Sequence, residues 1–547
     1  GGAHMQIQFL GAAEVVTGSN ILITTDKYNI LLDCGMFQGS EQLEKLNFEN
    51  FAYNPEDIDF LILSHAHIDH SGRIPKLVKE GFKGRIITTK ATQDLCNIML
   101  MDSAHIQESD VKWENRKRER SGKEPILPLY TEDDAKISLK YFEPYLYDQR
   151  IELSEDIFVR FKDAGHILGS SIVELWIKEK DDFTKIVYSG DLGMPGRPII
   201  KDPEFIDEVD YLIVESTYGN RVHDDIKESS KQLVDIINKT VLRGGTVIIP
   251  SFAVGRTQEL IYELNKYYEH DKNVEEFMKI PVYIDSPMAV LATDAFQANS
   301  YFFDEETKKL ILNGDNPFSF SNLKYVRSQE ESMKLNQYNF PKVIISSSGM
   351  CTAGRIRHHL KHNLWKAYNS VIFVGYQAEG TLGRIILDGA KKVKILGEQI
   401  EIEAEIYDLE GFSGHADKNM LTKWIKEFKV KPKKVFVVHG EKEAAETFAG
   451  IIQNEIKLPV IIPKLGDEYE INEEFVQKQH GQILEPIQQN EEIKKELQEV
   501  YDQFESLIYR TDKIIDPNFV DKDYDRLKNK LLELQQKLMD VNMLLGK

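Results

Sequence analysis

Short apolar runs alternate with polar turns from Met5 to about residue 210. Runs such as QIQFLG, NILLDCG, DFLILS and KIVYSGD are bounded by turn residues, which predicts strands, several of them buried on both faces. Residues 74–81 and the polar stretch 91–121 between them are predicted to form helices. From about residue 210 to 395, runs such as YLIVES, GTVIIPS and KVIISSS alternate with helical patterns, as in a doubly wound α/β domain.

The pattern of the first block returns after residue 396, in IEIEAEIYDLEGF, KKVFVVHGE and PVIIPK. The middle block is therefore expected to be inserted into the first domain, which closes after it. These changes divide the chain into a first domain, 5–210, an inserted α/β domain, 211–395, the closing part of the first domain, 396–474, and a C-terminal extension, 475–547.

The C-terminal extension has apolar residues at helical spacing and lacks Gly and Pro within EEIKKELQEVYDQFESLI and DYDRLKNKLLELQQKLMDVNMLL. These two stretches predict helices joined by TDKIIDPNF, either an antiparallel pair or a dimerising coiled coil. The apolar stripe of the second stretch is expected to bury against the body or a second subunit, and it includes Leu527, Leu531, Leu534 and Leu538.

Composition narrows the class of protein. The 547 residues include 89 acidic and 68 basic side chains, a formal net charge of −21 that argues against nucleic-acid binding through general surface charge. A small electropositive site remains compatible with this balance, because two divalent cations would add about +4 locally. Hydrophobic residues are 41% and charged residues 29%, as in an ordinary globular protein.

The cysteines and the N-terminal residues indicate the cellular compartment of the protein. The three cysteines lie far apart without a CxxC pair, which excludes a disulfide framework or Cys-rich zinc finger and favours a reducing environment. No run approaches 18 uncharged apolar residues, so no membrane-spanning helix is expected. GGAH before Met5 has the character of a tag scar, and the residues after Met5 lack a signal-peptide pattern, so a cytoplasmic protein is expected.

The strongest chemical signal is SHAHIDH, which directly follows the strand DFLILS. Residues two apart in an extended segment point the same way, so His65 and His67 can bind one ion. Asp69 and His70 then turn toward a second position, and imidazole with carboxylate ligands suits zinc. A single His is more often a hydrogen-bonded core residue, but four ligand-type side chains within six residues favour a metal site.

Further candidate ligands follow other predicted strands. His166 follows FVRFKDAG, Asp191 follows IVYSG, and His439 follows KKVFVV. Each stands where an apolar run ends in a Gly-containing loop, and active sites are built where such loops converge at a sheet edge. Together with SHAHIDH, these residues predict a dinuclear site.

These motifs resemble a known family. HAHIDH, the later His166 and Asp191, and Asp33 in LLDCG are similar to the metallo-β-lactamase fold hydrolases. The inserted block, with VESTYGNR, PSFAVGR, SSSGM and GYQAEGTLGR, resembles the β-CASP nucleases, and FSGHAD and VVHGE match that group's later motifs. The closest branch is the one related to the nuclease subunit of the cleavage and polyadenylation specificity factor, with its bacterial counterparts. FLGAAEVVTGSNILI favours this branch over ribonuclease J.

The resemblance covers Met5 to about residue 470, and the final helices match no family pattern. It implies an α/β fold: an αββα metallo-β-lactamase sandwich with an inserted β-CASP domain, followed here by a helical C-terminal extension. It also implies two zinc ions. His65, His67 and His166 would hold one, Asp69, His70 and His439 the other, with Asp191 as the bridge.

The implied activity is a zinc-dependent ribonuclease that hydrolyses single-stranded RNA, in RNA processing or decay. Two metals about 3.5–4 Å apart activate a hydroxide and offset phosphoryl charge, while Asp191 fixes their spacing and Asp69 completes the site. His415 in GFSGHAD is the candidate general acid, and Glu215 at the end of YLIVE would orient it and act only through it. His439 indicates an RNA substrate, because the DNA cross-link repair nucleases of this superfamily have Val at that motif.

Loop residues of the inserted block are candidates for holding phosphates, although ordinary turn chemistry explains each equally well. These candidates are Ser251, Arg256, Ser348, Gly349 and Arg384. The basic run at Arg116, Lys117, Arg118 and Arg120 is more often a solvated helix face than an RNA track. Tyr218 either stacks on a base or packs the domain junction, and packing is favoured.

Two other functions compete with a ribonuclease. One is a small-molecule hydrolase of this fold, of the thioesterase or lactonase type, which would need neither the inserted domain nor His415. The other is a non-catalytic RNA-processing scaffold, which the complete ligand set disfavours. The expected partners are single-stranded RNA and, through the C-terminal helices, a second subunit, with no membrane. The choice between endonuclease and 5′-exonuclease action stays open.

Overall fold

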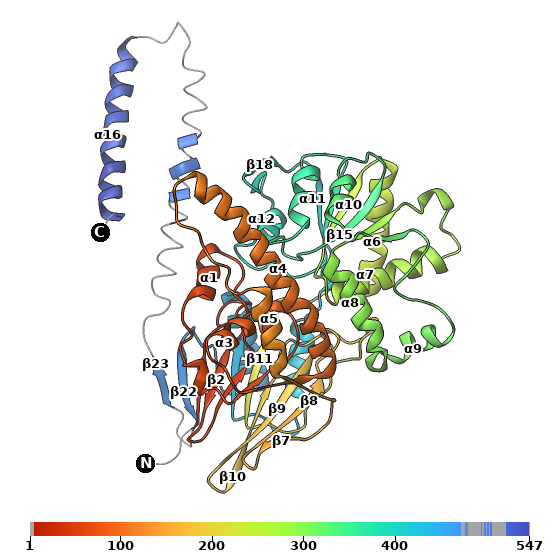
Figure 1. Cartoon of the computed structure of the whole chain (residues 1–547), viewed down its shortest axis with the longest axis vertical. Helices are drawn as coiled ribbons and strands as arrows, with labels where there is room; N and C mark the ends of the chain where they lie inside the picture. Colours follow the sequence, from red (N-terminus) through yellow and green to blue (C-terminus); the bar gives the residue numbers. More distant parts are fainter. Residues whose placement is uncertain are drawn as a thin grey trace. The chain divides into compact units, whose positions relative to one another are not determined.

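The computed structural model describes residues 5–471, 476–479, part of 494–505 and 521–545 (Figure 1). The chain divides into two compact units, Gly1–Gly481 and Gln482–Lys547. The first unit carries all the motifs of the predicted site.

Two sheets pack face to face at the centre of the first domain. Side chains of both, among them Ile30 and Ile62 from one and Val159 and Ile186 from the other, form a single buried cluster. The eight-stranded sheet has the order β23 (Val476–Gln479), β22 (Asp467–Ile471), β1 (Met5–Phe9), β2 (Ile21–Thr24), β3 (Asn29–Leu32), β4 (Phe60–Ile62), β5 (Arg85–Thr89) and β6 (Phe142–Tyr145). The seven-stranded sheet has the order β21 (Val460–Ile461), β20 (Lys434–Val438), β11 (Tyr211–Glu215), β10 (Asp182–Tyr188), β9 (Ser171–Glu179), β8 (Ile157–Asp163) and β7 (Ile151–Ser154).

Helices cover the outer faces of both sheets and complete the αββα sandwich. The alternation within β4 explains why that strand is apolar throughout: Phe60 and Ile62 face the second sheet, whereas Leu61 packs in the cluster beneath the helices. The helices of the first domain are α1 (Glu41–Lys45), α2 (Ile68–Ser71), α3 (Ile74–Lys79), α4 (Lys90–Arg120), α5 (Glu132–Ser138), α13 (Lys418–Lys426) and α14 (Lys442–Ile451). The predicted helices at 74–81 and 91–121 correspond to α3 and α4. The short strands β6, β7 and β22 were not predicted.

The inserted domain is built on a six-stranded sheet in which all neighbours are parallel, as the pattern of uniformly buried strands predicts. Its strand order is β14 (Leu323–Tyr325), β13 (Val282–Asp285), β15 (Lys342–Ser346), β12 (Thr246–Pro250), β16 (Ser370–Phe373) and β19 (Glu405–Asp408). Around the sheet lie α6 (Ile226–Leu242), α7 (Arg256–Asn265), α8 (Pro287–Ala298), α9 (Glu305–Leu312), α10 (Gln329–Leu335), α11 (Ile356–Asn363), α12 (Leu382–Leu387) and the hairpin of β17 (Lys392–Ile395) and β18 (Glu398–Glu401).

Two strands lie in a different sheet from the one that the pattern indicates. YLIVES forms β11, which pairs in parallel with β10 and β20 of the first domain rather than with the inserted strands. The end of IEIEAEIYDLEGF forms β19, which extends the inserted sheet beside β16. Which strands pair depends on the tertiary fold, and apolar character alone does not specify it. The division at residues 210 and 395 therefore stays a prediction. The first domain's sheet still includes β11, which ends at Glu215, and the inserted sheet still includes β19, which ends at Asp408.

In the second unit, residues 521–545 form the predicted second helix, α16 (Asp521–Leu545). Leu531 and Leu538 of its stripe are 41% and 38% exposed, and Leu527 and Leu534 are partly buried. Most of the predicted first helix and the linker TDKIIDPNF lie outside the described residues. Among the helices that the structure describes, none is both long and apolar enough to cross a membrane.

Candidate metal centre

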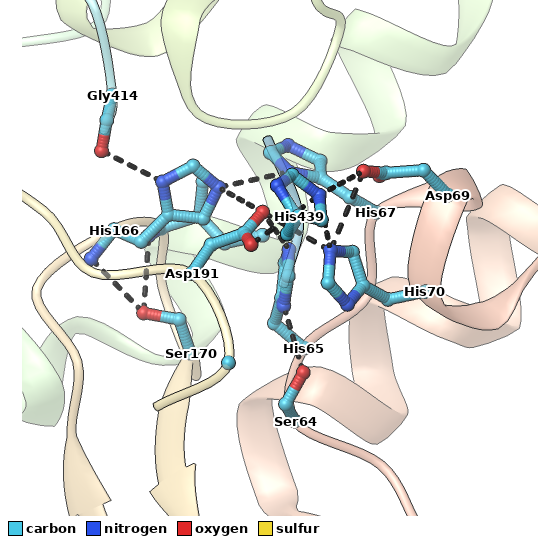
Figure 2. Close-up of polar contacts among 12 residues, drawn as sticks. Ser64, His65, His67, Asp69, His70, His166, Ser170, Asp191, Gly414 and His439 are labelled. Atoms are coloured by element: carbon cyan, nitrogen blue, oxygen red, sulfur yellow. Dashed lines mark hydrogen bonds and ion pairs between the residues drawn. The ribbon is translucent and has the colours of Figure 1, made fainter. Parts of the chain in front are cut away.

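The predicted ligands gather where several strands end at one edge of the sandwich (Figure 2). His65 follows β4, His67 caps the N-terminus of α2, and α2 carries Asp69 and His70. The other three ligands follow strands of the second sheet: His166 after β8, Asp191 after β10 and His439 after β20. Parallel strands and their connections thus bring residues up to 374 positions apart in sequence into one site.

The seven side chains form two groups that meet at Asp191. Within the group of His65, His67 and His166, and within the group of Asp69, His70, Asp191 and His439, the ligand atoms all lie within 4.8 Å of one another. Asp191 Oδ2 is 3.4 Å from His65 Nε2, 3.1 Å from His70 Nε2 and 3.6 Å from His166 Nε2. Asp191 Oδ1 is 3.5 Å from His439 Nε2. The carboxylate therefore lies between the two groups, where a bridge is expected.

Unsatisfied buried atoms show that this donor set fits metal ions. His65 Nε2 and Asp191 Oδ1 are buried without a hydrogen-bond partner among the described residues. Two pairs of ring nitrogens face each other at 3.2 Å: His70 Nε2 with His439 Nε2, and His166 Nε2 with His67 Nδ1. Buried polar atoms are nearly always paired, so converging and orphaned donor atoms point to bound cations. Five imidazoles and two carboxylates suit zinc.

Every ligand imidazole is held by a hydrogen bond at its other ring nitrogen. Such outer contacts fix which nitrogen is free for a metal. The partners are Ser64 Oγ for His65 Nδ1 at 3.0 Å, Asp33 Oδ2 for His70 Nδ1 at 2.6 Å, Gly414 O for His166 Nδ1 at 2.7 Å, Thr217 Oγ1 for His439 Nδ1 at 2.9 Å, and Val254 O for His67 Nε2 at 3.2 Å. His67 thus offers Nδ1 and the other four offer Nε2.

Asp33, which the resemblance matches to a structural aspartate, orients ligands of the centre through hydrogen bonds. It is fully buried and accepts hydrogen bonds from Ser64 N at 2.7 Å and from Tyr188 Oη at 2.7 Å, besides that of His70. Because Ser64 in turn contacts His65, one carboxylate orients a ligand from each of the two groups. The partner residues Ser64, Tyr188 and Thr217 and the carbonyls of Val254 and Gly414 were not predicted from the sequence.

Burial and charge set the protonation of the ligands. Burial lowers the pKa of His67 to about 3 and also lowers the pKa values of His65 and His166, so these imidazoles are neutral. Burial opposes ionisation of Asp69 and Asp191, but the neighbouring His70 and His439 hold the pKa of each carboxyl well below its usual range. The carboxylates of Asp191, Asp69 and Asp33 raise the pKa of His70 well above its usual range against the effect of burial, so this imidazole must lose a proton when metal binds, because neutral imidazoles and ionised carboxylates are the binding forms.

His415 and Glu215 form a separate pair beside the centre. His415 Nδ1 lies 3.3 Å from Glu215 Oε1. Burial alone would lower the pKa of His415, but the carboxylates of Glu215 and Asp191 outweigh it and raise that pKa. Glu215 also lies within ligand distance of Asp191 and His439, but its oxygens already accept bonds from Leu192 N, at 2.7 Å, and from Thr217. Glu215 is thus placed to orient His415 rather than to bind metal.

Glu215 has a second contact besides His415, so the expectation that it acts only through His415 stays a prediction. Glu215 Oε2 accepts the hydroxyl proton of Thr217 at 2.7 Å, and the same hydroxyl oxygen lies 2.9 Å from His439 Nδ1. One buried carboxylate therefore contacts the candidate acid directly and a candidate metal ligand through Thr217. The sequence could not reveal this, because the contact depends on β11 and β20 lying side by side.

Residues of both domains line the space above the centre. His67, Asp69, His166, Asp191, His415 and His439 share a cavity with Phe252, Arg256, Met350 and Tyr376 of the inserted domain. A larger cavity of about 390 Å³ adjoins it and shares His67, Asp69 and Phe252 with it. The site is therefore enclosed between the sandwich and the inserted domain.

The predicted phosphate-binding residues are divided among different places. Arg256 lines the cavity over the centre and is paired with Glu259, while Ser348 and Gly349 line the larger cavity. Ser251 is buried and bonds Thr257 Oγ1 at 3.0 Å, and Arg384 bonds Glu441 at 3.3 Å, and neither lines these two cavities. Tyr218 is buried edge-on against Tyr376, as the packing interpretation expects.

Comparisons with known proteins agree with this architecture. Three family descriptions match the chain: the metallo-beta-lactamase superfamily over residues 13–242, the Beta-Casp domain over 257–386, and the Zn-dependent metallo-hydrolase RNA specificity domain over 399–463. The chain is similar to Ribonuclease TTHA0252 of Thermus thermophilus, with 37% identity over 80% of this chain and 94% of that protein. It is 33% identical to an RNase J-like protein of Methanocaldococcus jannaschii, over 84% of this chain and 98% of that protein, and 33% identical to the transcription termination factor FttA of the same organism, over 84% and 70%.

Proposed function

This chain belongs to the β-CASP ribonucleases of the metallo-β-lactamase superfamily and is a metal-dependent nuclease, and from that premise we propose that it hydrolyses phosphodiester bonds of single-stranded RNA with two zinc ions. The observation that carries the proposal is the place of Asp191. One of its oxygens, Oδ2, faces both groups of candidate ligands, at 3.4 Å from His65 of one group and 3.1 Å from His70 of the other. A carboxylate so placed supports two ions rather than one.

The residues that would hold zinc are those of the two groups. His65, His67 and His166 would bind one ion, Asp69, His70 and His439 the other, and Asp191 both. Bound there, two zinc ions lower the pKa of water and offset charge on the phosphoryl group. Val254 and Gly414, through the carbonyls that hold His67 and His166, couple this centre to the inserted domain and the segment that returns from it.

The proton for the leaving ribose oxygen is assigned to His415. Its Nδ1 faces Glu215, so the Nε2 edge is free for the cavity over the centre, which His415 lines. Glu215 raises the pKa of His415, which favours the protonated imidazole that a general acid requires. Arg256 lines the same cavity, and its guanidinium, although paired with Glu259, would donate hydrogen bonds to a phosphate there.

Alternatives without RNA cleavage have less support. A small-ester hydrolase does not need the walls that Phe252 and Tyr376 of the inserted domain add to the cavity. We also infer a cytoplasmic location, supported by the three cysteines, all of which are buried free thiols.

RNA should be cleaved in preference to DNA. The proposal rests on His439, which stands at the motif where the DNA-specific branch has Val. Rates on matched single-stranded RNA and DNA oligonucleotides with zinc-loaded protein test this expectation. End labels would also separate endonuclease from 5′-exonuclease products. DNA cleavage as fast as RNA cleavage would contradict the assigned substrate.

The C-terminal extension should mediate self-association. The apolar stripe of α16 repeats at alternating spacings of three and four residues, and its Leu531 and Leu538 are more than a third exposed. Deleting 482–547, which leaves β23 in its sheet, should reduce a dimer to a monomer, as measured by light scattering, while zinc content stays unchanged. A protein that is a monomer both at full length and after truncation would exclude this role.

A further inference from the structure

Helix α4 connects the larger cavity to a basic surface. It is 31 residues long, packs against α8 of the inserted domain and appears in orange in Figure 1. One face of α4 lines the cavity of about 390 Å³ beside the metal centre, with Met99, Ser103, Ile106 and Asp110. These residues recur at spacings of three and four, so they form a single stripe along the helix.

The same stripe continues beyond the cavity to Trp113 and Lys117. Trp113 lies three residues after Asp110, Lys117 four residues after Trp113, and the rise from Met99 to Trp113 is roughly 21 Å. The indole is 49% exposed, and Lys117 Nζ lies 3.5 Å from the centroid of its ring. A large aromatic side chain and a cation thus stand directly in line with the cavity wall.

Positive charge gathers at this end of α4 although the whole chain is strongly acidic. Between Lys112 and Glu124, six basic side chains accompany three acidic ones. Arg118 is held by Glu114 at 3.8 Å and by the carbonyl of Glu124 at 3.0 Å. Arg116 and Arg120 are exposed and have no ion-pair partner within the part of the chain that the structure describes. Their charges are therefore available to a ligand.

The segment after α4 runs back beside the helix as a second wall. Two hydrogen bonds of Asn115 hold this segment against α4: Nδ2 donates to Ile126 O at 2.9 Å, and Oδ1 accepts from Ile126 N at 2.8 Å. Pro128 and Leu129 then line the cavity, and Leu127 between them and Ile126 is 81% exposed. Residues of α4 and of this segment thus line the same cavity.

The acidic residues of the stripe do not block an anion. Asp110 is paired with Arg357 of the inserted domain at 3.6 Å, which brings a further cation to the opening. Burial raises the pKa of Asp102 to about 6, so its carboxyl carries less than a full charge in mildly acidic solution. Positive charge consequently increases from the cavity toward the tip of α4.

We propose that this outer stripe is a binding track for the part of a single-stranded RNA that extends beyond the cavity. A base stacks on Trp113, and phosphates contact Lys117, Arg116 and Arg120. Stacking accepts any base because every base has a π face, and exposed cations that track a backbone add salt-dependent affinity. The contact of Lys117 with the indole is exposed and weak, so a phosphate can displace it. This inference rests on the proposed RNA substrate of the metal centre.

The test uses full-length protein carrying His415→Ala, so that RNA is bound but cleaved slowly. Fluorescence anisotropy with a labelled RNA of about 20 nucleotides measures Kd. Trp113→Ala should raise Kd by about 5–100-fold, and Trp113→Phe should recover most of the loss, because a ring still stacks. Replacing Lys117 and Arg116 with Gln should reduce the slope of log Kd against log salt by about 0.7 for each lost contact.

Chain-specific controls make the result decisive. The control variant is Trp365→Ala with Lys366→Gln. It removes a similar pair, because Trp365 is 54% exposed and Lys366 Nζ lies 5.3 Å from its ring centroid. This pair is not on α4, so its loss should leave Kd unchanged. With His415 intact, Trp113→Ala should leave hydrolysis of a nitrophenyl phosphodiester unchanged, because that substrate is too small to reach Trp113, which lines neither cavity.

The outcomes separate this inference from the proposed function. A Kd within about twofold of the parent after Trp113→Ala, or an equal loss in the Trp365 control, overturns the track even if RNA is cleaved. A slower small-substrate rate in Trp113→Ala would show a structural effect and also overturn it. A protein that binds RNA through Trp113 but never cleaves it would instead contradict the proposed function and leave the track standing.

Discussion

Replacing His415 with alanine is expected to slow RNA cleavage by about 10²–10⁴-fold while leaving the zinc content near that of the parent protein. His415 lines the cavity over the centre and pairs with Glu215 at 3.3 Å. The proposed zinc ligands are held by other hydrogen-bond partners, so removing His415 should leave them in place. Elemental analysis and single-turnover cleavage of RNA measure the two quantities on the same preparation.

The matched control is His439→Ala. His439 Nε2 lies 3.1 Å from Asp69 and 3.5 Å from Asp191, so its loss should weaken one zinc site and reduce the bound metal. If His415→Ala loses as much zinc as His439→Ala, then His415 is a ligand and the assignment as general acid is wrong.

The leaving group provides an independent check on the acid. A nitrophenolate departs without needing a proton, so hydrolysis of a nitrophenyl phosphodiester should suffer much less from His415→Ala than RNA cleavage does. Glu215→Gln should show only part of this rescue, because Glu215 also bonds Thr217, which contacts His439. An equal loss on both substrates in His415→Ala would remove the proton-transfer role.

Replacing Asp191 with asparagine is expected to have an effect at least as large, a loss on the order of 10³-fold or more, because the variant should lose metal as well as charge. The parent protein should bind two zinc ions per chain. The variant should bind one or none, because the amide cannot supply two anionic oxygens to the two ligand groups that now lie 3.1–3.6 Å from the carboxylate.

Asp207→Asn is a suitable control for this substitution. Asp207 is an exposed carboxylate whose ion pair with Lys429 is at the surface, so its loss should change neither zinc content nor activity. Chelation of the parent protein should reproduce the activity loss of Asp191→Asn, and zinc addition should restore it only in the parent. An Asp191→Asn protein that keeps two zinc ions and cleaves RNA normally would refute the bridging role.

The hydrophobic pattern accounted for most strands of both domains, because a strand buried on two faces requires an uninterrupted apolar run. It did not distinguish which sheet each run would join. YLIVES pairs with β10 and β20 of the sandwich, and the end of IEIEAEIYDLEGF pairs with β16 of the inserted sheet. The strands β6, β7 and β22 were also not predicted, since FEPY, IELS and DEYEI are too short and polar to stand out.

The sequence alone determined which residues could be ligands, because side-chain chemistry and strand-end positions are local properties. SHAHIDH with three later strand ends was enough to predict one dinuclear site. Only the tertiary structure decided how those ligands are oriented and which other residues contact them. Val254, Gly414 and Thr217 orient three of the imidazoles from other elements, and Trp113 stands in line with a cavity wall that no local pattern reveals. Hydrogen-bond direction and cavity shape depend on elements distant in sequence, and so they exist only after the sheets have paired.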